Sequence, residues 1–226
     1  MTVYQSVLAF GDSHVAGCEL SADTYLYLTG NVTLEHADAA GKLLAFPQIV
    51  ADKLNVPCYN YALSGGSNDR SMRLLVQTVQ EHPDSLVLFG YTCTDRTEFY
   101  YPDKGNFLGR DKDNFVQVGL PWKDFTKGVP LEHHINDIYI EKILRPYNNL
   151  DQLIFLVDAV CSLYAKKVVH LPLTSEKITR TDKMFDFEKC HSYVEWCTQK
   201  KFKQLPYLHY DQDAHKELAK LILEKL

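Results

Sequence analysis

Ser13 and His209 are the two side chains whose type and placement best suit catalysis in this 226-residue chain. Ser13 follows the apolar residues 7–10 and the dipeptide Gly-Asp, so the sequence places it where a buried strand ends. A hydroxyl at the carboxyl end of a strand is accessible, and the backbone N–H groups of the next turn lie near it. That position suits a nucleophile, with His209 as the general base. The alternative is that Asp12 or Ser13 only caps the following helix.

A second turn carries paired glycines. Residues 60–68 read Asn-Tyr-Ala-Leu-Ser-Gly-Gly-Ser-Asn, a short strand that runs into the glycines and then into a helix start. Glycines at such a turn let the backbone approach a ligand and direct N–H groups at it, which is what an oxyanion needs. Alternatively, glycine only supplies the positive φ of a tight turn, and Ser67 or Asn68 caps the helix.

Both turns resemble motifs of the SGNH (GDSL-like) hydrolases. Residues 8–13, Leu-Ala-Phe-Gly-Asp-Ser, are similar to the family's first block, in which the serine is the nucleophile; His14 stands where the family often has Leu. Residues 60–68 are similar to the second block, Asn-x-x-x-x-Gly, which places an oxyanion donor at Gly65. The resemblance implies that the backbone N–H groups of Ser13 and Gly65 hold the oxyanion.

The third block of the family departs from its usual pattern here. After the apolar residues 85–89 the family has Gly-x-Asn-Asp, whereas this chain has Gly-Tyr-Thr-Cys-Thr-Asp-Arg. Thr92 takes the place of the asparagine; its hydroxyl can donate one hydrogen bond, from a shorter side chain. Arg96 could contribute positive charge instead. Losing one oxyanion donor costs on the order of 100- to 1,000-fold in rate, so the departure concerns activity rather than fold.

Two histidines near the C-terminus compete for the role of base. His209 precedes the last predicted helix, with Asp211 as its N-cap, whereas His215 shares one helical face with apolar residues. The resemblance places the base before that helix and an orienting Asp three residues earlier, where this chain has Pro206. The rival match, Asp213 with His215, puts the histidine inside the helix. We prefer His209 and expect its Nδ1 to contact a backbone carbonyl, a water or Asp211.

The order of predicted elements indicates a parallel sheet with helices on both faces. Apolar runs predict strands, and helical spacing separates them; the strands fall at residues 6–10, 56–61, 85–89 and 167–172, and the helices at 46–54, 72–79, 132–145, 153–164 and 215–226. The resemblance implies a doubly wound α/β three-layer sandwich of the flavodoxin-like SGNH type. We expect one domain, 1–226, with insertions on the site side at about 19–45 and 97–130, where no clear period is visible.

Composition excludes several classes of protein. The net charge is −5, with 24 basic and 29 acidic residues, so there is no basic surface for nucleic acid. No apolar stretch is long enough to span a bilayer, and no signal peptide is visible. The six cysteines are scattered without zinc-finger spacing. We therefore expect a cytoplasmic protein with reduced thiols and no metal.

The function that the resemblance implies is a serine esterase that needs no cofactor. Its expected partner is a small-molecule or carbohydrate ester, such as an O-acetylated sugar. Residues expected to support the site, or to replace one of its members, are Asp12, His14, Asn68, Arg96, Asp211, Asp213 and His215. The alternative is a binding or structural protein that keeps the fold and has lost part of the machinery. The spacing of the first two blocks also resembles that of SGNH-like proteins of large tailed phages.

Overall fold

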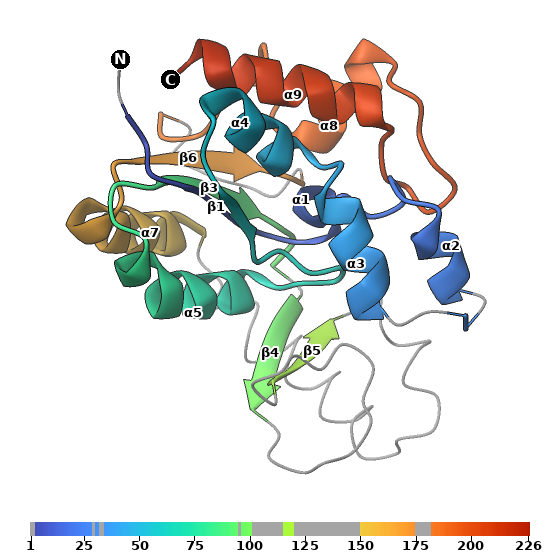
Figure 1. Cartoon of the computed structure of the whole chain (residues 1–226), viewed down its shortest axis with the longest axis horizontal. Coiled ribbons are helices and arrows are strands. Elements are labelled where there is room, and N and C mark those ends of the chain that lie inside the picture. The colour runs from blue at the N-terminus through green and yellow to red at the C-terminus, as the bar shows by residue number, and fades with distance from the viewer. Residues whose placement is uncertain are drawn as a thin grey trace.

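The core of the molecule is a four-stranded parallel sheet (Figure 1). The computed structural model describes residues 3–28, 30–31, 34–94, 96–100, 115–119, 150–174 and 182–226. The strands lie in the order β2-β1-β3-β6 and are β1 (Val7–Phe10), β2 (Cys58–Asn60), β3 (Leu86–Tyr91) and β6 (Lys167–Pro172). This order begins as flavodoxin-like sheets do, so the predicted doubly wound α/β fold is confirmed.

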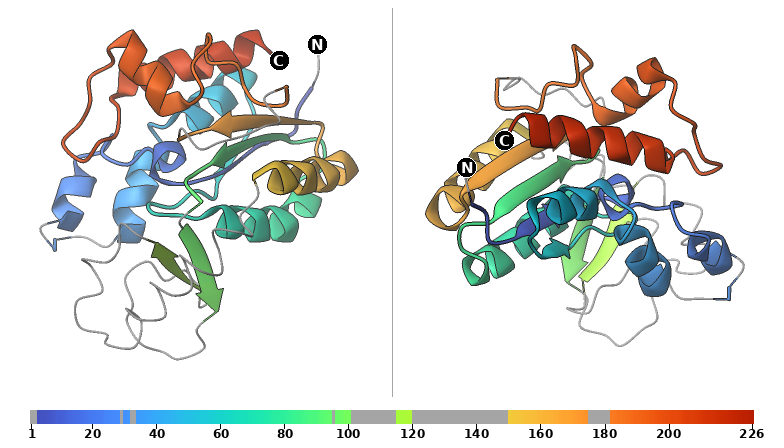
Figure 2. Two further views of the ribbon diagram at one scale, coloured as in Figure 1. Left: turned by 180° about the vertical axis from the view of Figure 1, so that it is seen from behind. Right: turned by 45° about the horizontal axis from the view of Figure 1, so that its top comes forward.

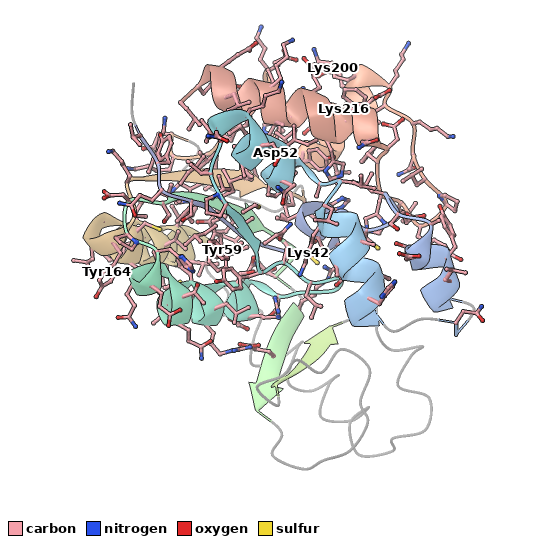
Figure 3. All side chains as sticks on the ribbon, viewed as in Figure 1. Lys42, Asp52, Tyr59, Tyr164, Lys200 and Lys216 are labelled. Atoms are coloured by element: carbon pink, nitrogen blue, oxygen red, sulfur yellow. The ribbon has the colours of Figure 1, made fainter. Side chains whose placement is uncertain are left out.

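Helices cover both faces of the sheet, which makes the three predicted layers (Figure 2). One face carries α1 (Ser13–Ala16), α4 (Phe46–Leu54), α8 (Tyr193–Lys200) and α9 (Gln212–Glu224). The other carries α5 (Asn68–Thr78), the short helix η1 (Val79–Glu81) and α7 (Leu150–Tyr164). The polar faces of these helices point outward, as Lys200 and Lys216 do in Figure 3.

The central strand β1 explains why its sequence is continuously apolar. Successive side chains of a strand point to opposite faces. Val7 and Ala9 pack into the cluster under α4 and α9, whereas Leu8 and Phe10 pack into the cluster under α5 and α7. All four are fully buried, and Phe10 pairs with Phe89 of β3 in register. Both faces therefore fix the position at which β1 ends, directly before the nucleophile turn.

Residues 19–45 are more regular than their sequence predicts. They form α2 (Asp23–Leu28) and α3 (Leu34–Lys42). Gly17 and Gly41, which are poor helix formers in the interior of a helix, serve helix packing here. A Cβ on Gly41 would lie 2.5 Å from the Gly17 carbonyl oxygen, and a Cβ on Gly17 would lie 2.6 Å from that of Gly41. The two glycines thus let α3 pack closely against the end of α1.

The second predicted insertion contains an antiparallel hairpin, β4 (Arg96–Tyr100) with β5 (Phe115–Gly119). Two hydrogen bonds attach it to α5, because Arg73 donates to Glu98 from Nε at 2.7 Å and from Nη2 at 3.0 Å. The remainder of residues 97–130 and the helix predicted at 132–145 lie outside the described residues. Within the described ranges, no helix has the length and apolar character needed to cross a membrane.

Candidate active site

Ser13 begins α1 immediately after β1, in the position that the sequence predicts. Asp12 caps this helix, since its Oδ1 accepts a hydrogen bond from the His14 N–H at 3.0 Å. The turn needs Gly11, whose φ is +149° and whose added Cβ would lie 2.5 Å from a Val15 methyl carbon. The Cys18 N–H donates to the Ser13 carbonyl at 2.9 Å. These contacts fix the backbone around the serine.

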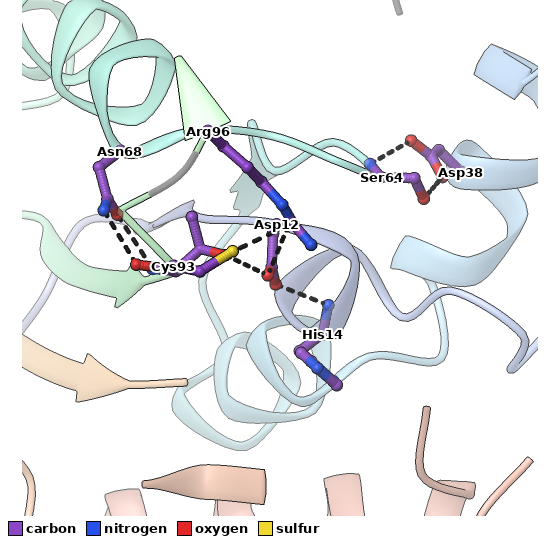
Figure 4. A network of polar contacts seen from close by, with 8 residues as sticks. Asp12, His14, Asp38, Ser64, Asn68, Cys93 and Arg96 are labelled. Carbon is purple, nitrogen blue, oxygen red and sulfur yellow. Dashed lines mark hydrogen bonds and ion pairs between the residues drawn. The ribbon is translucent and has the colours of Figure 1, made fainter. Parts of the chain in front are cut away.

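Asp12 is a buried anion at the centre of a polar network (Figure 4). Its Oδ2 accepts hydrogen bonds from the Thr92 hydroxyl at 2.7 Å and from Arg96 Nη1 at 3.2 Å. Burial alone would raise the pKa of Asp12, but the His14 ring where acid protonates it, the Arg96 charge and the Thr92 hydrogen bond lower it below its usual value. The carboxylate is therefore ionised at neutral pH, and its oxygens are occupied by hydrogen bonds within the protein.

Thr92 has a different role from the one expected. Its single hydroxyl proton is donated to Asp12, which leaves none for an oxyanion, contrary to the prediction. Asn68 holds the Thr92 backbone on both sides, with its Oδ1 accepting from the Thr92 N–H and its Nδ2 donating to the Thr92 carbonyl, both at 3.0 Å. Thr92 and Asn68 thus attach the end of β3 and the start of α5 to the nucleophile turn.

The glycine turn lies directly against the nucleophile turn. A Cβ on Gly66 would lie 2.9 Å from the carbonyl oxygens of both Gly11 and Leu63, so only glycine fits there. Gly65 has a φ of +76°, in the left-handed region that favours glycine. The turn that carries Gly65 is therefore next to the turn that carries Ser13, as the sequence predicts.

Two polar residues hold the glycine turn in place. The Asn60 amide donates to the Val15 carbonyl at 2.9 Å, which connects β2 to α1. The Ser64 hydroxyl donates to Asp38 Oδ1 at 2.7 Å, and its N–H donates to Oδ2 at 3.1 Å (Figure 4). Asp38 belongs to α3, in a region where the sequence showed no functional signal. The Gly65 N–H consequently has a fixed position.

His209 is held by a buried carboxylate, Glu19. The ring Nδ1 of His209 lies 2.7 Å from Glu19 Oε2, and the backbone N–H of His209 donates to the same oxygen at 3.3 Å. The Tyr207 N–H and the Tyr25 hydroxyl also donate to this carboxylate, whose side chain is 0% exposed. An ionised carboxylate only accepts hydrogen bonds, so this contact requires a proton on Nδ1 and, in a neutral imidazole, leaves Nε2 as the accepting nitrogen. A general base needs that tautomer.

Glu19 was not found from the sequence, and Asp211 does not orient His209. The Asp211 carboxylate instead accepts from the Ala214 N–H and caps α9, as the helix-start interpretation predicted. Glu19 lies 190 residues from its partner and belongs to no motif. Its φ of +68° is rare for a residue other than glycine. Only the folded chain brings this pair together.

The His209 ring contacts the ring of His14, the residue after the candidate nucleophile. The two rings are 5.1 Å apart between centroids, and His14 directly follows Ser13. Burial, with smaller effects from nearby charges, lowers the pKa of His14 to about 4, so it is neutral at pH 7. In the part of the chain that the structure describes, Ser13 Oγ makes no hydrogen bond to a histidine ring. Catalytic hydrogen bonds often form only in the substrate complex.

His215 has a structural role at the interface of α9 and α4. Its Nδ1 accepts the Phe46 N–H at 3.1 Å, and the side chain is buried. Asp213, its rival partner in the sequence, pairs instead with Lys216 on the surface at 3.3 Å. The alternative dyad of Asp213 and His215 is therefore not formed.

The imidazoles of His14 and His215 predict a loss of stability in acid. Burial is the main reason that the pKa is about 3 for His215 and about 4 for His14, against about 6.5 in an unfolded chain. Between these values the unfolded chain binds more protons. The free energy of unfolding therefore falls as pH falls, by about 1.4 kcal/mol per pH unit for each such proton. Urea titrations at pH values from 7 downward should show this fall in the free energy of unfolding. His215→Gln should reduce the slope of that free energy against pH by the contribution of about one proton. An unchanged slope would contradict the assignment.

No metal site is visible among the described residues, where no group of three His, Cys, Asp or Glu side chains converges. All six cysteines are free. Cys18 is partly buried beside Glu19, and burial raises the pKa of its thiol to about 11. It is therefore a poor nucleophile.

Comparison with known proteins gives similar structures without similar sequences. No family model and no curated protein matches the chain. Axe2, an acetylxylan esterase from Geobacillus stearothermophilus, is 13% identical with a TM-score of 0.44, over 100% of this chain and 96% of that chain. A variant of Axe2 is 14% identical with a TM-score of 0.46, over the same shares. A carbohydrate esterase described as having divergent catalytic and non-catalytic binding functions is 15% identical with a TM-score of 0.35, over 98% and 67%. At these identities the chemistry of this chain has to be inferred from its own residues.

Proposed function

We propose that this protein is a serine hydrolase that cleaves an ester, with Ser13 as nucleophile and His209 as base. One observation carries the proposal: the His209 ring lies beside the residue that follows Ser13, and its Nδ1 is bound to the buried Glu19 carboxylate. This arrangement leaves Nε2 free to accept a proton. A nucleophile, a base and a group that orients the base are the parts that acyl transfer requires.

The reaction would proceed in two steps. Ser13 Oγ attacks the ester carbonyl while His209 Nε2 takes its proton, and that proton passes to the leaving alcohol. Water then attacks the acyl-enzyme by the same route and releases the acid. The N–H groups of Ser13 and Gly65 would hold the oxyanion in both steps. Glu19 would stabilise the imidazolium that forms each time.

The proposed substrate is an ester such as an O-acetylated carbohydrate. This finer assignment depends on the resemblance of the Ser13 and Gly65 turns to those of SGNH hydrolases. It predicts faster turnover of acetyl esters than of long-chain acyl esters, which a series of 4-nitrophenyl esters of increasing chain length would measure.

A fluorophosphonate probe tests the nucleophile directly. We expect the folded protein to be labelled at neutral pH, on the peptide that contains Ser13, and Ser13→Ala to be unlabelled. Ser162→Ala is the matched control, because that hydroxyl only bonds the Ala159 carbonyl on α7 and should not affect labelling. A folded wild type that takes no label would support the alternative, a binding protein with this fold.

A further inference from the structure

Arg96 reaches the nucleophile turn with more hydrogen-bond donors than its neighbours use. Its side chain starts at β4 and extends across Asp12 toward α1 (Figure 4). Nη1 donates to Asp12 Oδ2 and to Thr92 Oγ1, both at 3.2 Å. A guanidinium carries five N–H donors, and both of these contacts use Nη1. Nε is buried and has no hydrogen-bond partner among the residues that the structure describes.

An orphaned donor of this kind needs an explanation. A charged N–H that is buried without an acceptor is costly, and such groups in native structures usually serve a function. The place is also one where negative charge is disfavoured, since the Asp12 carboxylate adjoins Ser13 and is buried. An oxyanion on the carbonyl that Ser13 attacks would be repelled by Asp12 unless a cation offset that charge.

We propose that Arg96 is the third donor to the oxyanion, in the role that the sequence had suggested for Thr92. This inference rests on the proposed serine hydrolase function. Thr92 gives its proton to Asp12, so the hydroxyl is unavailable, whereas Arg96 has unused donors and a full positive charge. Positive charge that is already in position before the reaction needs no reorganisation in the transition state.

The guanidinium is held in position by its surroundings. Asp12 and Thr92 fix Nη1, and the Arg96 side chain is 18% exposed. Two residues further along β4, Glu98 is bonded to Arg73 of α5 by two hydrogen bonds. The strand that carries Arg96 is thus attached to the helix that follows the glycine turn.

Steady-state kinetics of Arg96→Gln on 4-nitrophenyl acetate would test this role. We expect kcat to fall on the order of 100- to 1,000-fold, with KM changed only a few-fold and with slower fluorophosphonate labelling. Arg96→Lys keeps the positive charge but not the planar guanidinium, so its kcat should fall less than that of Arg96→Gln. Guanidinium ion added to Arg96→Ala should restore part of kcat, which a purely structural role would not produce.

Two control variants separate this role from support of the fold. Thr92→Val removes the hydrogen bond to Asp12 and one of the two contacts of Arg96 Nη1, but keeps the guanidinium and its bond to Asp12. Arg73→Gln loosens the hairpin. Each variant should lower kcat less than tenfold. If Arg96→Gln loses no more activity than Thr92→Val, or if guanidinium rescues nothing, Arg96 only holds Asp12 and the inference is wrong. Should Arg96→Gln fail to fold, the kcat of Arg96→Lys and the guanidinium rescue of Arg96→Ala decide whether Arg96 stabilises the oxyanion or only holds Asp12. An unlabelled wild type would instead reject the proposed hydrolase itself.

Discussion

Replacing His209 with asparagine should lower kcat by about 10⁴- to 10⁶-fold, the usual consequence of removing the base from an acyl-transfer site. An asparagine side chain can still bond Glu19 but cannot take the proton of Ser13. Labelling by a fluorophosphonate should slow in parallel, because it also needs the activated hydroxyl. The measurement is kcat and KM on 4-nitrophenyl acetate together with the rate of labelling.

The matched control is His215, a buried histidine near the C-terminus. His215→Asn weakens the hydrogen bond that the Phe46 N–H donates, so it should lower the melting temperature while kcat stays within tenfold of the wild type. Equal losses of kcat in both variants, with both proteins folded, would show that the base is wrongly assigned. The comparison therefore separates a group that moves a proton from one that holds two helices together.

The parts of the fold that could be predicted are those whose sequence pattern is local. The strands β1 and β3 lie within continuous apolar runs, because helices cover both of their faces. Helix α7 follows its apolar spacing in the same way. Helices α2 and α3 were missed because residues 19–45 show no clear apolar period. Gly17 and Gly41 instead allow the backbones of α1 and α3 to touch. That contact is tertiary and leaves no local pattern.

In the candidate site, too, the residues with a local sequence pattern could be predicted and the contacts between distant segments could not. Ser13, the glycine turn and Asn68 could be placed from the sequence, because each follows a strand end or begins a helix. The partners of Thr92 and of His209 could not, because they come from distant segments. Thr92 bonds Asp12 across 80 residues and His209 bonds Glu19 across 190, so pairing depends on how the loops fold. Sequence spacing also gave Asp211 as a possible partner of His209. In the structure, however, the Asp211 carboxylate caps α9.

Glu19→Gln should lower kcat by on the order of 10²- to 10⁴-fold, with KM changed little. Glu19 accepts from the Tyr207 and His209 N–H groups as well as from Nδ1. An amide has one accepting oxygen, and its NH₂ would face these donors, so either the loop or the His209 tautomer must change. In a serine protease the equivalent loss of the carboxylate costs about 10⁴-fold through the wrong tautomer. Stability should fall as well, by about 1–3 kcal/mol, because a buried donor loses its acceptor.

Asp211→Ala distinguishes positioning of the base from support of the loop. This carboxylate lies two residues after His209 and caps α9, so its loss should cost about 1 kcal/mol of stability and leave kcat within a few-fold of the wild type. Melting temperature and kcat are measured together for both variants. If Glu19→Gln loses kcat only in proportion to its stability, as Asp211→Ala does, Glu19 supports the loop alone. A loss of kcat in the Glu19 variant well beyond that, in protein that remains folded at the assay temperature, identifies Glu19 as the residue that positions the base.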